Sequence, residues 1–226
     1  MIEQVTLRDG TDAYVLPLLR TDKTTLAAEF ETLAPESRRR RFLAPVMHLS
    51  DAMLKHLVDD VDGIDHIALV LCAETSPDVY DPVALARMVR YADVPDAADL
   101  AVTVKDAWQG RGVATALLGI LMRRRPVGVD RIVTEVFSDN RASVSMLCRL
   151  GHATVEDLGS GVSEVVVDLA PLKASASVPR GFDTHPDTGA TVLAPASAVE
   201  ERTPPLRDHA RRHALRTRDQ VCPWFS

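Results

Sequence analysis

Long apolar runs are missing from this sequence: no stretch of 18 apolar residues occurs, and no charged segment followed by an apolar one opens the chain. Without a membrane-spanning segment or a secretion signal, the protein is expected to reside in the cytoplasm, with no membrane partner. Positive charge is in deficit as well, because 26 Lys and Arg residues face 32 Asp and Glu residues, a net charge of −6. This balance argues against nucleic acid as a partner.

Cysteine and metal-binding patterns are also sparse. The three cysteines, Cys72, Cys148 and Cys222, are widely separated, and the seven histidines show no H-E-x-x-H or paired spacing. These absences exclude a disulfide framework and a recognisable zinc site, so no metal is expected. The chain does have length and apolar content: 226 residues, 46% hydrophobic and 26% charged, suffice for a well-buried soluble domain and an extension.

The clearest local pattern lies between Asp99 and Arg125. It begins with a β-rich apolar segment over 100–104, which predicts a strand. A short polar turn and two glycines follow, and then apolar residues recur at three- and four-residue spacing until Pro126 ends the run. The sequence therefore predicts a strand, a glycine-bearing turn and a helix in immediate succession.

Such a turn can bind an anion. The first N–H groups of a helix have no intrahelical partner and carry partial positive charge. Gly110 and Gly112 lack Cβ atoms, so a phosphate or pyrophosphate can approach the backbone closely. The alternative is that both glycines only form a tight strand-to-helix turn. The pattern is neither a Walker P-loop nor a G-x-G-x-x-G fingerprint.

Two motifs resemble those of one family. Gln109-x-x-Gly112-x-Ala114 is similar to the Q/R-x-x-G-x-G/A signature of GNAT-superfamily acetyltransferases, and the segment from Asn140 to Leu150-Gly151-His152 resembles their second motif. The resemblance covers roughly residues 5–169. It implies acetyl-CoA as co-substrate. The residues that it assigns to acetyl-CoA are the backbone of Val102, Thr103 and Val104, the loop Gln109, Gly110, Arg111, Gly112, Val113 and Ala114, and Asn140.

The resemblance also suggests a catalytic base. Asp99 stands near the start of the central strand, where many family members have a glutamate, and it can take the proton of the acceptor ammonium directly or through water. Asp99 can instead pair at a strand end, and Glu135 is the second candidate. Many members place a tyrosine seven residues after the motif asparagine as general acid. Here that position is Leu147, which puts a protein general acid in doubt.

The rest of the chain supplies the fold class. Strands are expected over 4–7, 13–16, 66–72, 83–89, 132–137, 153–155 and 164–169, and helices near 22–33, 35–42, 50–58 and 140–150. A loop is expected between 72 and 83, and Gly151 is expected to cap the helix before it. This order matches an α/β (α+β) fold of the GNAT type, a mixed, mostly antiparallel central sheet flanked by helices. The run Arg38–Arg41 is expected to face either solvent or an anionic part of a ligand.

A change of character near residue 170 suggests two parts. Residues 171–226 hold seven of the 14 prolines and lose apolar periodicity, so a low-order C-terminal extension is expected, with a short basic helix at 206–218. Residues 1–170 are expected to form the GNAT domain.

The predicted function is transfer of an acetyl group from the acetyl-CoA thioester to a primary amine by direct attack. The amine belongs to a small molecule or to a protein lysine, and the chain is a monomer or a homodimer. The alternative is a non-catalytic CoA-binding sensor or scaffold, which the departures at Asp99 and Leu147 suggest.

Overall fold

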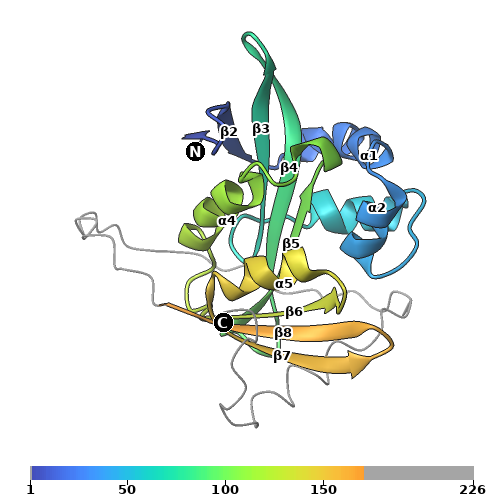
Figure 1. The fold of residues 1–226 in the computed structure, drawn as a ribbon, viewed down its shortest axis with the longest axis vertical. Coiled ribbons are helices and arrows are strands. Elements are labelled where there is room, and N and C mark those ends of the chain that lie inside the picture. The colour runs from blue at the N-terminus through green and yellow to red at the C-terminus, as the bar shows by residue number, and fades with distance from the viewer. Residues whose placement is uncertain (1, 171–226) are drawn as a thin grey trace, which may run out of the picture.

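The computed structural model of the protein describes residues 2–170, which form one eight-stranded sheet in the order β1-β2-β3-β4-β5-β6-β8-β7 (Figure 1). The strands are β1 (Glu3–Thr6), β2 (Asp12–Pro17), β3 (His66–Ser76), β4 (Val79–Arg90), β5 (Ala97–Val104), β6 (Arg131–Phe137), β7 (Gly151–Gly159) and β8 (Val162–Leu169). All neighbouring strands are antiparallel except β5 and β6, which confirms the predicted fold class. The predicted extension over 171–226, with its helix at 206–218, lies outside the described residues.

Helices cover both faces of the sheet. They are η1 (Arg20–Asp22), α1 (Lys23–Glu31), α2 (Pro35–Phe42), α3 (Asp51–Leu54) with its π-helical continuation η2 (Lys55–Asp59), η3 (Asp106–Trp108), α4 (Val113–Arg123) and α5 (Arg141–Cys148). Residues of α4 and α5 belong to the main apolar core, whereas α1, α2 and η2 contribute to a second core around Ala68 of β3. Among residues 2–170, no helix is long and apolar enough to cross a membrane.

Local sequence explains where these helices begin and which side they bury. In α4, the buried positions are Val113, Leu117, Leu118, Ile120 and Leu121, which form one stripe of the helix. Ser50 caps α3 by accepting a hydrogen bond from the backbone N–H of Met53, and Asn140 caps α5 by accepting one from Ser143.

The two parallel strands diverge soon after they meet. The β5–β6 register contains only Ala97 opposite Arg131 and Ala98 opposite Ile132. Beyond Ala98, β5 stays paired with β4 as far as Val104 but has no ladder partner in β6. One edge of β5 is therefore open in the middle of the described sheet, next to the loop that leads to α4.

Two local expectations were wrong. The predicted loop between 72 and 83 is mostly strand, because β3 and β4 extend to Ser76 and Val79 and are joined by a tight turn in which Asp78 has a φ of 61°. Gly151 does not cap a helix but begins β7. A Cβ at this position would lie 2.0 Å from the carbonyl oxygen of Asp168, so the close approach of two strands requires the glycine.

Candidate active site

A tight loop with two left-handed residues joins β5 to α4. Gly110 has a φ of 76° and Gly112, the N-cap residue of α4, has a φ of 88°. These backbone conformations favour glycine over any residue with a side chain. The helix that begins at Val113 consequently presents its first N–H groups at this loop.

Side chains of the loop hold it against the rest of the protein. Gln109 Nε2 donates to the carbonyl oxygen of Val104 at 3.2 Å. Arg111 donates to Asp9 and to Thr11 and stacks on the ring of Trp108, with 3.9 Å between its Cζ and the ring centroid. Both polar side chains are thus engaged within the protein, so the loop offers a ligand mainly its backbone.

The last two predicted loop residues differ in exposure. The side chain of Val113 is buried in the main core with 1% exposed, whereas Ala114 is half-buried. Val113 can therefore contact a ligand only through its backbone.

Sequence reasoning missed a cation beside this loop. Arg8, in the turn between β1 and β2, lies along Gly112, and a Cβ added to Gly112 would be 2.9 Å from Arg8 Cγ. Arg8 is exposed, and no ion pair joins it to another residue of 2–170. No local signal marks it, because Arg8 and Gly112 lie about a hundred positions apart in the chain.

The open edge of β5 presents the peptide groups of alternate residues. The N–H of Lys105 donates to Val83 of β4 at 2.9 Å, so the backbone groups of Thr103 also point toward β4. Those of Val102 and Val104 point the other way, toward the opening. A ligand in the opening therefore meets the backbone of these two valines, while Thr103 can contribute only its side chain.

Two side-chain contacts agree with this alternation. The carbonyl oxygen of Leu100 accepts a hydrogen bond from the hydroxyl of Thr134 in β6 at 3.1 Å, across the point where the strands diverge. The carbonyl oxygen of Val104 accepts the bond from Gln109. Between these two satisfied carbonyls, the peptide groups of Val102 face the opening.

Asp99 lies where β5 and β6 separate. It is half-buried, and its Oδ1 accepts a hydrogen bond from Thr134 at 2.8 Å. Two guanidinium groups, those of Arg41 and Arg87, interact electrostatically with it. Burial lowers the pKa of Arg41, and it lowers that of Arg87 to about 10, while the charge of Asp99 opposes both shifts. The charges of both guanidinium groups thus act at the site of the predicted base.

The second candidate base has different neighbours. Glu135 is half-buried and lies directly opposite Glu164 in the β6–β8 pairing. The neighbour of Glu135 across the strands is thus a carboxylate, whereas two guanidinium groups act on Asp99.

The residues of the second motif flank the opening from β6. Asn140 follows the carboxyl end of β6 as the loop 109–114 follows that of β5, and its amide is 8% exposed. Leu147 is 2% exposed and belongs to the main core. No group of three potential metal ligands occurs among residues 2–170.

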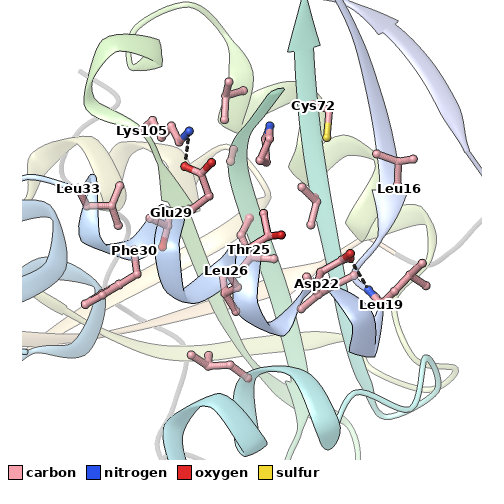
Figure 2. A pocket seen from close by; sticks show the side chains of 18 of the residues that line it. Leu16, Leu19, Asp22, Thr25, Leu26, Glu29, Phe30, Leu33, Cys72 and Lys105 are labelled. Atoms are coloured by element: carbon pink, nitrogen blue, oxygen red, sulfur yellow. Dashed lines mark hydrogen bonds and ion pairs between the residues drawn. The ribbon is translucent and has the colours of Figure 1, made fainter. Parts of the chain in front are cut away.

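A cavity of about 460 Å³ lies on the face of the sheet covered by α1 and α2 (Figure 2). Residues of α1 (Thr25, Leu26, Glu29 and Phe30) line one side, together with Asp22 before the helix and Leu33 after it. The remaining walls come mostly from apolar residues of β2, β3 and β4. The cavity reaches Thr103 of β5 and Arg41, which acts on Asp99. Asp99 does not itself line the cavity, so Arg41 is the residue that connects the two.

The opening beside β5, the glycine loop at the helix N-terminus and the nearby carboxylate coincide with a match to the Acetyltransferase (GNAT) family model over residues 35–152. The chain belongs to the GNAT acetyltransferase family. Residues 99, 102–104, 109–114 and 140, which sequence reasoning assigned to the GNAT site, lie around this opening; their individual roles stay predictions.

Three comparisons place this GNAT domain among known proteins. The acetyltransferase Pat of Mycolicibacterium smegmatis is 33% identical over 192 residues, which are 84% of this chain and 55% of Pat. The crystal structure of the GNAT domain of S. lividans PAT matches with a TM-score of 0.63 and 31% identity, over 74% of this chain and 97% of that domain. The yncA protein of Salmonella typhimurium, solved with its cofactor acetyl-CoA, shares the fold, with a TM-score of 0.54, 17% identity and coverage of 73% and 96%. The chain spans about half the length of the Mycolicibacterium relative.

Proposed function

We propose that the protein is an acetyl-CoA-dependent N-acetyltransferase that transfers the acetyl group to a primary amine by direct attack. The observation that carries this proposal is the open edge of β5, which lies between the N-terminus of α4 and the carboxylate of Asp99. Membership of an acetyltransferase family favours this activity over a non-catalytic CoA-binding module.

In this proposal, backbone groups hold the co-substrate. The N–H groups at the start of α4 bind the pyrophosphate, next to the glycine at 112, and Arg8 adds a positive charge on the same side. The peptide groups of Val102 and the N–H of Val104, whose carbonyl oxygen accepts from Gln109, bind the pantetheine amides in the opening. Asn140 contacts the cofactor from the β6 side while its Oδ1 caps α5.

Asp99 serves as the base. It accepts a proton from the acceptor ammonium, directly or through water, and the neutral nitrogen then attacks the thioester carbonyl carbon. A C–N bond forms, the C–S bond breaks, and CoA leaves as a thiolate that is protonated by solvent. Arg41 and Arg87 disfavour a further positive charge near Asp99, which assists deprotonation of the amine.

The reaction limits the acceptor to a class of compound and is compatible with more than one oligomeric state. A small-molecule amine and a protein lysine both satisfy the chemistry, and a monomer or a homodimer can perform it. Because acetyl-CoA is produced and consumed in the cytoplasm, we propose a cytoplasmic location.

The experiment that tests this proposal measures CoA release from acetyl-CoA with a panel of primary amines. The Asp99→Asn variant should lower kcat by about 10²-fold or more, the ordinary contribution of a general base, with unchanged affinity for acetyl-CoA. Glu135→Gln is the matched control, since it neutralises the rival carboxylate, and it should stay within a few-fold of the unmodified protein. Unchanged turnover in Asp99→Asn would remove this residue from the mechanism.

A further inference from the structure

One arginine of the run 38–41 lacks the partners that its neighbours have. Arg38 donates to three backbone carbonyls, and Arg39 and Arg40 both form ion pairs with Glu36. Arg41 makes no hydrogen bond or ion pair with any residue of 2–170 and lies with its Cζ 4.9 Å from the ring centroid of Phe42. The four arginines of the run therefore differ in their surroundings, although the sequence places them together.

Arg41 lines the cavity beside α1. Of the four charged side chains in that lining, the other three have partners: Asp22 accepts a hydrogen bond from the backbone N–H of Leu19 at 2.8 Å, and Glu29 is paired with Lys105 (Figure 2). Among the charged groups that line the cavity, Arg41 alone is therefore available to a ligand.

A second cation, the guanidinium of Arg87, interacts electrostatically with half-buried Arg41. Arg87 is 5% exposed, its Nη2 donates to His56 Nε2 at 2.9 Å, and its Nε has no hydrogen-bond partner among the described residues. Because arginine only donates, His56 accepts at Nε2 and is neutral in this arrangement. Asp99 acts on both arginines, and Asp60, which also acts on Arg87, is ion-paired with Lys55. The carboxylate of Asp99 is thus shared between two guanidinium groups, and the charge of Arg41 has no carboxylate of its own.

Buried cations without matching anions are costly unless a ligand supplies the missing charge. A carboxylate is suited to this role, since it binds a guanidinium through paired hydrogen bonds. The rest of the cavity offers an apolar wall, with Leu26, Phe30 and Val70 among its residues, and its volume of about 460 Å³ lies in the range of small-molecule sites. An amine near Asp99, a carboxylate at Arg41 and an apolar body in the cavity can belong to one molecule.

We propose that the acceptor is a free amino acid with an apolar side chain, whose carboxylate binds Arg41. This inference rests on the proposed acetyl transfer and assigns the substrate class of the same site. A polyamine fits poorly, because its additional positive charges would face the arginines. A protein lysine side chain would leave the charge of Arg41 unmatched.

The test compares leucine with leucinamide and 3-methylbutylamine, which keep its amine and apolar body but lack the carboxylate. Leucine should have a kcat/KM at least about 10-fold higher than either analogue, the effect expected for one charge-assisted contact. Ionisation of the amine does not explain a preference over leucinamide, because the amide has the less basic amine. Arg41→Gln should remove the preference, so that kcat/KM for leucine and for 3-methylbutylamine in this variant agree within about 2-fold. Arg40→Gln, in the same helix but paired with Glu36, is the matched control and should retain it.

A binding experiment separates failure of this inference from failure of the proposed reaction. Leucine and leucinamide are titrated into the CoA-saturated protein by calorimetry, which needs no turnover. Tighter binding of leucine that disappears in Arg41→Gln supports the carboxylate site even if no amine releases CoA, in which case only the proposed reaction fails. Equal binding and turnover of leucine and leucinamide by the unmodified protein would overturn the inference, as would turnover of lysine peptides alone.

Discussion

Adding a Cβ atom at Gly112 distinguishes the two roles that the sequence allows for the glycine loop: binding a pyrophosphate, or only forming a tight strand-to-helix turn. Gly112→Ala and Gly110→Ala both place a side chain on a left-handed backbone, with φ values of 88° and 76°. Each should lower the free energy of unfolding by about 1 kcal/mol. For a domain of this size, the loss corresponds to a fall of about 2–4 °C in Tm.

The two variants differ in what the new atom meets. At Gly110 it has no neighbour within 4 Å, whereas at Gly112 it lies 2.9 Å from Arg8 Cγ at the start of α4. If the loop binds pyrophosphate at this helix N-terminus, Gly112→Ala should weaken acetyl-CoA binding by about 10-fold, or 1.4 kcal/mol, and by more than Gly110→Ala does. Urea unfolding gives the stability change, and calorimetric titration gives the affinity. A Gly112→Ala protein with the expected stability loss and full acetyl-CoA affinity would show that the glycines only form a turn.

Further predictions concern charge. Burial, and then the charge of Arg87, lowers the pKa of His66 to about 4. Between pH 6.5 and pH 4 the unfolded chain therefore binds a proton that the folded protein excludes, and the free energy of unfolding decreases as the pH is lowered. Acidification from pH 7 to pH 5 should lower the free energy of unfolding by roughly 2 kcal/mol through His66. Urea unfolding of His66→Gln should show a smaller decrease between these two pH values. The control variant His48→Gln, which replaces a side chain that is 79% exposed, should show the same decrease as the unmodified protein. Arg8→Ala should weaken acetyl-CoA binding by about 10-fold, more at low than at high salt, with little change in Tm. Equal affinities at both salt concentrations would argue against Arg8 as a phosphate ligand.

Much of the fold follows from local patterns in the sequence. The stripe of apolar residues in α4 and the helix that follows Asn140 depend only on near neighbours, and both appear where they were expected. The glycine loop is recognisable for the same reason, because its two left-handed residues are fixed by the strand-to-helix turn itself.

What the sequence did not reveal depends on contacts between distant segments. The proximity of Arg8 to Gly112 requires the β1–β2 turn to pack beside α4. The glycine at 151 looked like a helix cap, but its requirement comes from the carbonyl of Asp168 on a neighbouring strand. The difference between Arg41 and the other arginines of its run likewise depends on a cavity built from several elements, so composition alone cannot show it.

The most direct test of the central claim is thermal unfolding of the purified protein with saturating acetyl-CoA. At about 100 times its dissociation constant, a ligand that binds only the folded state adds roughly 2.7 kcal/mol, which should raise Tm by on the order of 5–10 °C for a domain of this size. The account predicts this shift with acetyl-CoA and CoA, but not with ATP or NAD at the same concentration. No shift with acetyl-CoA or CoA, in a protein that unfolds cooperatively, would contradict the acetyl-CoA site.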